Sequence, residues 1–100
     1  MPTRSGKRWV TVERVQTGAR MEKRMVKVLK ALAEYHDLSL GDLLEGIVLH
    51  AFANVPPFTS GTLQRIAQLK EVYEMDYDVT QSHRFSELPA SAEEIASSKG

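Results

Sequence analysis

The sequence has no cysteine and no long apolar run. Without cysteine the chain forms no disulfide and offers neither thiol chemistry nor cysteine-ligated zinc, which fits a reducing cytoplasm. No apolar run approaches the roughly 20 residues that a helix needs to span a bilayer, and the N-terminus has no apolar signal core. We therefore expect a cytoplasmic protein that does not enter a membrane.

Residues that would support catalysis are also scarce. The three histidines, His36, His50 and His83, are scattered without metal-ligand spacing. The chain has no glycine-rich phosphate loop and no nucleophile motif of the Gly-x-Ser-x-Gly kind. We therefore expect no enzyme, no bound metal and no cofactor.

Net charge is zero, but the charges are unevenly distributed. Residues 1–30 contain nine Lys or Arg against two Glu, a net of +7, and residues 31–100 contain four basic and eleven acidic residues, a net of −7. A dimer would gather about fourteen excess positive charges near its N-terminal segments, a surface suited to phosphates. The alternative is a solvated helix face behind a floppy basic leader.

The stretch from Val15 to Phe52 is predicted to form one short strand and two amphipathic helices. The strand covers residues 15–21. In the first helix, apolar residues recur at spacings of three and four, the period of one buried face. Ser39 is placed to cap a second, strongly apolar helix, a contribution of about 1 kcal/mol. The apolar residues of the first helix are Met25, Val26, Leu29, Leu32 and Ala33.

One strand and two helices cannot bury this much apolar surface alone, and a lone strand leaves its backbone groups unpaired. A second copy solves both problems, because two strands pair across a two-fold axis and four helices interlock. We therefore expect a homodimer. Its core would comprise Met21, Met25, Leu29, Leu32, Leu43, Leu44, Ile47, Val48, Ala51 and Phe52.

A strand, a helix, a short turn with a Ser cap and a more apolar second helix resemble the ribbon-helix-helix family of DNA-binding dimers, the Arc, MetJ and CopG type of repressor. The match covers residues 15–53 of the 100. The resemblance implies a mainly α fold, with one short N-terminal strand paired antiparallel across an intertwined homodimer and an extra C-terminal helix. It also implies a sequence-specific transcriptional regulator that inserts the two-stranded ribbon into the major groove of double-stranded DNA.

The resemblance assigns a DNA surface by position. Gln16, Gly18 and Arg20 would face the bases, where Arg pairs with guanine and Gln with adenine. The backbone amides that open the second helix would hold a phosphate. With the basic side chains before them, the residues expected at phosphates are Arg4, Lys7, Arg8, Lys23, Ser39, Leu40 and Gly41.

The remaining segments divide the chain into four parts. We expect residues 1–14 to form a flexible basic N-terminal extension and residues 15–53 to form the dimerisation and DNA-binding domain. Residues 54–87 are expected to contain a turn-rich linker around two adjacent prolines and a third helix from about Thr62 to Met75. Residues 88–100, rich in Ala, Ser and Glu, are expected to form a disordered tail.

Three alternatives remain open from the sequence. The first alternative places the strand at residues 9–13, which have better β-propensity. The second is an antitoxin, since proteins similar to this family often mask a toxin with a C-terminal segment, here residues 58–87. The third is a structural dimer that has lost DNA binding.

Overall fold

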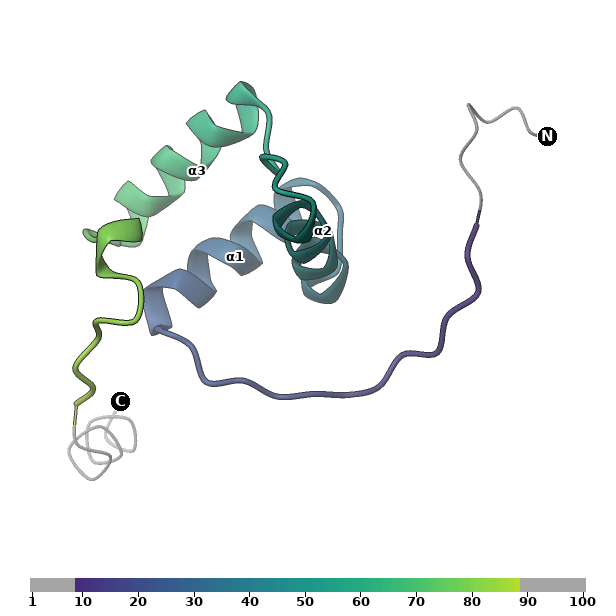
Figure 1. Ribbon diagram of the computed structural model, residues 1–100. Coiled ribbons are helices and arrows are strands. Elements are labelled where there is room, and N and C mark those ends of the chain that lie inside the picture. The colour runs from purple at the N-terminus through teal and green to yellow at the C-terminus, as the bar shows by residue number, and fades with distance from the viewer. Residues whose placement is uncertain (1–8, 89–100) are drawn as a thin grey trace.

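Three helices of equal length form the body of the protein (Figure 1). The computed structural model describes residues 9–88, in which α1 spans Lys23–Tyr35, α2 spans Leu40–Phe52 and α3 spans Ser60–Val72. A short 3-10 helix, η1, follows at Val79–Gln81. The described part of the chain is thus mainly α, as expected, and none of its helices is long and apolar enough to cross a membrane.

Each α-helix begins with a side chain that caps its free amides. The Ser39 hydroxyl accepts a hydrogen bond from the Asp42 N–H at 3.1 Å, as the sequence predicted. The Thr59 hydroxyl does the same for α3, and the Glu22 carboxylate accepts from the Met25 N–H at 3.0 Å at the start of α1. A cap of this kind contributes about 1 kcal/mol and fixes where the helix starts.

All three helices also end in the same tight turn. The residue after each C-cap has a left-handed backbone, and the next N–H donates to a carbonyl of the last helical turn at 2.8 to 2.9 Å. This is the Schellman arrangement, which usually has Gly at the left-handed position because a Cβ is strained there. Here these positions are occupied by Asp37, Asn54 and Glu74, with φ of 58°, 58° and 56°.

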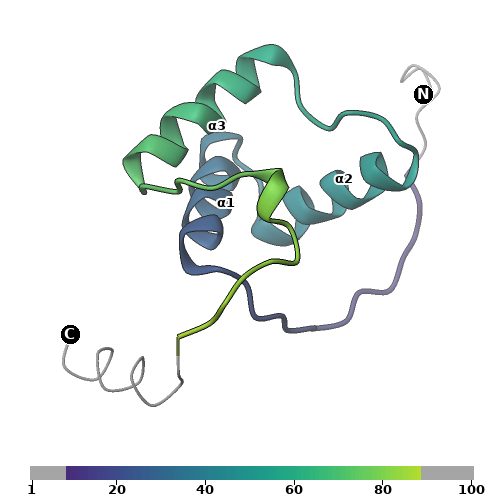
Figure 2. The same ribbon diagram turned by 60° about the vertical axis from the view of Figure 1, so that its left-hand side comes forward.

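The core lies where α1 meets the other two helices. Leu32 and Ala33 of α1 and Leu43 of α2 are buried, and Leu32 is only 1% exposed. The third helix packs on α1, so it belongs to this core, and Figure 2 shows α3 next to α1 and α2 extending to one side of α1. The side chains around the buried three are Leu29, Ile47, Phe58, Ile66 and Leu69.

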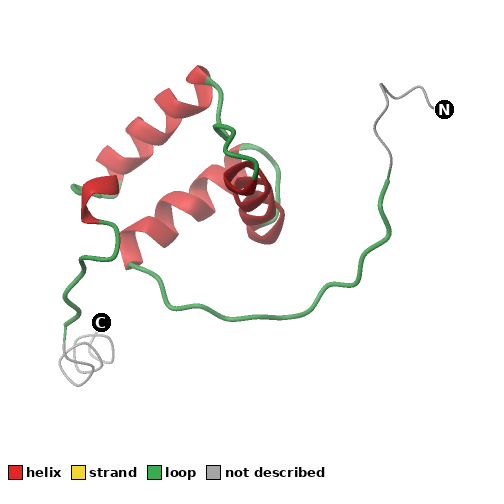
Figure 3. Ribbon diagram, in the orientation of Figure 1, coloured by secondary structure: helices red, strands yellow, loops and turns green. Residues whose placement is uncertain are grey.

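The expected ribbon is wrong for the described residues. Neither 15–21 nor the alternative 9–13 forms a strand, and residues 9–22 run as an extended segment outside the helical body (Figure 3). A strand needs a second strand to pair its amides and carbonyls, and no segment within residues 9–88 lies alongside to provide one. Gly18 and Ala19 at the centre of residues 15–21 also disfavour a strand, since Gly and Ala are poor strand formers.

Candidate nucleic-acid interface

The residues predicted to contact bases lie on an exposed, extended segment. This segment, the arm (residues 9–22), leaves the start of α1 and curves away below the helical body (Figure 1). Gln16, Gly18 and Arg20 are all exposed, and a Cβ added to Gly18 would meet no atom within 4 Å. Alternate residues of an extended chain point to the same side, so these three positions can face one surface together.

The arm contacts α2 through Arg14. Its Nε donates to Glu45 Oε2 at 3.1 Å and its Nη2 donates to Glu45 Oε1 at 2.9 Å. Asp42 adds a second carboxylate at 3.8 Å from Nη2. The paired fork of two parallel bonds is the geometry in which Arg binds carboxylates and phosphates best. The hydrogen bond from Arg14 is the main reason why the pKa of Glu45 lies below its usual value.

Arg20 has a partner from the other end of the chain. Its Nη2 donates to Glu87 Oε1 at 3.0 Å, and both side chains are largely exposed. The arginine that was predicted to contact bases therefore forms an ion pair with a residue 67 positions away in the sequence. The predicted phosphate-contacting residues Arg4, Lys7 and Arg8 lie outside the described residues.

A hydrogen-bonded cluster fixes the junction between the arm and α1. Glu22 accepts hydrogen bonds from the Met25 N–H, from Arg24 Nε at 3.0 Å and from the Tyr77 hydroxyl. Arg24 also donates through Nη1 to the Glu74 carbonyl and to Asp76 Oδ1, each at 3.0 Å. These bonds attach the segment after α3 to the C-terminal end of the arm, where α1 begins.

The same cluster shifts two pKa values in opposite directions. Partial burial alone would raise the pKa of Glu22, but hydrogen bonds from Tyr77, Arg24 and Met25 outweigh it and lower the pKa to about 2. Burial, followed by the hydrogen bond to the Glu22 carboxylate, raises the pKa of Tyr77 to about 12. Glu22 therefore stays charged and Tyr77 neutral at neutral pH.

Three lysines make α1 basic on its outer side. Lys23, Lys27 and Lys30 are exposed, and none of them forms an ion pair with another described residue. Lys27 lies over the ring of Tyr73, with its Nζ 5.9 Å from the centroid. Arg14, Arg20 and Arg24 are engaged with carboxylates. Among the cations of residues 9–30, the three lysines are therefore those that a phosphate can approach most directly.

The start of α2 was predicted to hold a phosphate on the amides of residues 39–41. The Ser39 hydroxyl already accepts a hydrogen bond from the Asp42 amide. The amides of Leu40 and Gly41 are therefore the ones in the first turn that a phosphate could bind. The exposed carboxylate of Asp42 lies in the same first turn. A negative side chain there satisfies the helix dipole and repels an incoming anion.

Some of the residues predicted for the dimer core are covered within one chain, and others are exposed. Leu32 and Leu43 are buried within one chain, and Leu29 and Ile47 pack against them. Met25 lines a pocket described below, and Leu44 is half-buried. Four of the predicted core residues remain exposed, namely Met21, Val48, Ala51 and Phe52.

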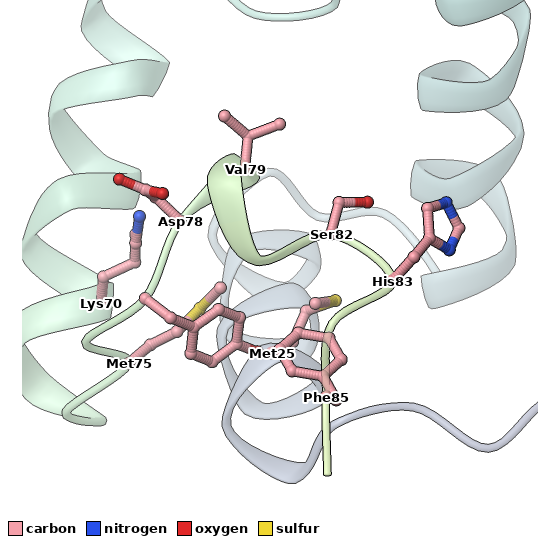
Figure 4. A pocket seen from close by; sticks show the side chains of 9 residues that line it. Met25, Lys70, Met75, Asp78, Val79, Ser82, His83 and Phe85 are labelled. Atoms are coloured by element: carbon pink, nitrogen blue, oxygen red, sulfur yellow. The ribbon is translucent and has the colours of Figure 1, made fainter.

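A pocket of about 430 Å³ lies between the N-terminal half of α1 and the segment after α3 (Figure 4). Met25, Met75, Tyr77 and Phe85 form its apolar floor, and the two aromatic rings meet edge to face at 5.1 Å. At the rim, Lys70 helps to lower the pKa of Asp78, after the larger effect of hydrogen bonds from Thr80. Asp78 therefore has a hydrogen-bond partner in Thr80, next to the pocket.

The sequence did not reveal the roles of Arg14, Glu22, Arg24 and Tyr77. The two arginines contributed only to a count of positive charge. Glu is not among the common capping residues, so nothing at residue 22 indicated a cap. Tyr77 lies 55 residues from its partner Glu22, beyond the range of any local pattern.

The chain was compared with protein-family models, with curated proteins and with solved structures, and none of them matches it.

Proposed function

We propose that this protein is a homodimeric DNA-binding regulator that uses the basic first third of the chain to hold the phosphate backbone. The observation that carries the proposal is the separation of charge. Residues 9–30 carry six basic and two acidic residues, whereas residues 31–88 carry three basic and nine acidic ones. Within residues 9–88 the net positive charge lies on the arm and α1, so a polyanion has one favourable approach.

The lysines of α1 are suited to phosphates, and the arm is suited to a groove. Lys23, Lys27 and Lys30 lie exposed without an ion-pair partner among residues 9–88. Gln16 and Arg20 are side chains that hydrogen-bond well to adenine and guanine edges, and both are exposed on an extended chain. In this proposal the lysines supply affinity and the arm supplies base contacts.

The dimer follows from apolar surface that one chain leaves uncovered. Seven side chains of the arm and α2 are 43% to 94% exposed. A second copy would cover them and bring two basic segments onto one DNA duplex. The seven are Trp9, Val10, Val12, Val15, Val48, Leu49 and Phe52.

A salt titration of DNA binding tests the proposal. Affinity for a duplex of about 30 base pairs is measured by fluorescence anisotropy from 50 to 300 mM salt, because counterion release makes log K fall with log salt by about 0.9 per phosphate contact. We expect the Lys23→Gln/Lys27→Gln/Lys30→Gln variant to bind more weakly and with a shallower slope. Arg84→Gln, which removes an exposed positive charge from the segment after α3, serves as the control. Absence of binding at the lowest salt would refute the proposal and favour a structural dimer.

Sedimentation equilibrium tests the dimer separately. Leu49→Glu/Phe52→Glu places two charges on the exposed face of α2 and should convert the dimer to a helical monomer. Val72→Glu alters a similarly exposed apolar residue on α3 and should leave the dimer intact. A wild-type protein that sediments as a monomer at micromolar concentration would exclude the dimer.

A further inference from the structure

The two arginines of the arm are each held by a carboxylate of the body. Arg14 is paired with Glu45 of α2, and Arg20 is paired with Glu87 of the C-terminal segment. These contacts attach the arm at two points that are six residues apart, one on each side of Gln16 and Gly18. The arm is thereby kept beside the acidic part of its own chain.

A carboxylate and a phosphate compete for the same face of a guanidinium. Arg14 uses both Nε and Nη2 on Glu45, which is the same fork that would grip two phosphate oxygens. Arg20 uses Nη2 on Glu87. The Nε and Nη2 edge of Arg14 cannot hold Glu45 and a phosphate at the same time, and the N–H of Arg20 that binds Glu87 is not available to a second acceptor.

We propose that Glu45 and Glu87 form an electrostatic latch that occupies the arm's arginines until a nucleic-acid phosphate or base replaces the carboxylates. The identity of the competitor, a nucleic acid, rests on the proposed DNA-binding function. Its own geometry is intramolecular and is tested without DNA. Asp42, 3.8 Å from Arg14, adds to the negative charge that holds the first point.

The exposure of these pairs makes the latch reversible. The side chains of Arg14 and Glu45 are 63% and 52% exposed, and those of Arg20 and Glu87 are 84% and 69% exposed. Exposed ion pairs favour the bound arrangement by only about two- to fivefold, and salt screens them. Such a latch slows access to the arm without blocking it, and a polyanion of high charge density can displace both carboxylates.

Limited trypsin digestion tests the latch, because trypsin must take each arginine side chain into its own specificity pocket. The initial rates of cleavage after Arg14 and after Arg20 are followed separately by mass spectrometry. We expect Glu45→Gln to raise cleavage after Arg14 by about two- to fivefold and to leave cleavage after Arg20 unchanged. Glu87→Gln should produce the reverse pattern, and 0.5 M salt should abolish both differences.

Glu71→Gln is the matched control, since Glu71 is exposed on α3 and forms no ion pair with residues 9–88. It should change neither rate. Far-UV circular dichroism confirms that each variant keeps its helices. Equal rates in the wild type and both latch variants, or a rise at both arginines in all variants, would overturn the latch.

DNA binding at 50 mM salt then tests the competition. Glu45→Gln/Glu87→Gln should bind a mixed-sequence duplex at least about twofold more tightly than Glu71→Gln/Glu74→Gln, which removes the same charge elsewhere. Equal affinities of the two double variants would overturn competition by the latch. If no variant binds DNA, the proposed function fails, whereas the site-specific change in trypsin cleavage still decides whether the latch exists.

Discussion

Replacing Glu22 with Gln should destabilise the protein through a single carboxylate that joins three parts of the fold. Glu22 caps α1 on the Met25 amide, binds Arg24 and accepts from the Tyr77 hydroxyl. Its side chain is 21% exposed, so the charge is only partly solvated. Glutamine has the same shape, and its oxygen can still accept from the Met25 N–H and the Tyr77 hydroxyl, but its NH2 group cannot accept from Arg24 Nε and it carries no charge. The substitution therefore removes the charge and the bond to Arg24 while it keeps the volume of the side chain.

The expected loss follows from the pKa of Glu22, which falls from 4.5 to about 2 in the folded chain. That change is equivalent to about 3 kcal/mol at about 1.4 kcal/mol per pKa unit. Solvent screening at a partly exposed site reduces it, and we expect about 2 kcal/mol at pH 7. A chain of this size has a stability of roughly 5–15 kcal/mol, so the change is easily measured.

The dependence on pH has a definite sign. Because the folded-state pKa of Glu22 is depressed, its stabilising contribution is complete above the unfolded pKa of 4.5 and is lost as pH falls toward about 2. The wild type should therefore lose its advantage over Glu22→Gln between roughly pH 5 and pH 2. Glu45 and Asp78 also have lowered pKa values, and they titrate in both proteins, so they cancel in the difference.

Urea denaturation followed by circular dichroism at 222 nm provides the measurement. Trp9 is 94% exposed, so its fluorescence reports poorly on unfolding. Protein concentration must be held constant, because dimerisation would add to the apparent stability. Tyr77→Phe, which keeps the ring and removes only the hydroxyl donor, should give a smaller loss in the same direction. Equal stability of the wild type and Glu22→Gln at pH 7 would refute this account of the cluster.

Three further substitutions test the core and the helix ends by the same urea assay. Leu32→Ala removes the most deeply buried side chain and should cost about 2–5 kcal/mol; a loss below 1 kcal/mol would mean that this core is not formed. Ser39→Ala removes the cap of α2 and should cost about 1 kcal/mol, whereas Ser39→Asp should retain most of the stability. Glu74→Gly should stabilise by about 0.5–1 kcal/mol, because Glu74 has a φ of 56° and Gly relieves that strain; destabilisation would argue against the left-handed turn.

The helices could be predicted from the sequence because their causes are local. The periodic apolar residues of α1 and the position of Ser39 lie within a few residues of the structure that they determine. The third helix was expected over about Thr62 to Met75 and spans Ser60–Val72, a difference of a few residues at its ends. Its end was missed because Glu74 takes a conformation that normally signals Gly.

The strand was predicted wrongly because a strand is not a local structure. Alternation of side chains in residues 15–21 indicates only that an extended chain is possible. Hydrogen-bonded partners must then come from elsewhere, and residues 9–88 of one chain do not provide them. Residues 15–21 are extended in the structure, but they form no sheet with another segment of residues 9–88.

The sequence by itself determined three amphipathic helices, the cap on α2 and the separation of basic from acidic charge along the chain. Only the tertiary structure decided which charges meet. It brought Arg14 to Glu45, Arg20 to Glu87 and Glu22 to Tyr77, across 31, 67 and 55 positions. Helix propensity and capping act over a few residues, whereas an ion pair depends on where packing places two distant segments. Three arginines that the sequence showed only as positive charge, Arg14, Arg20 and Arg24, are therefore paired with carboxylates in the folded chain.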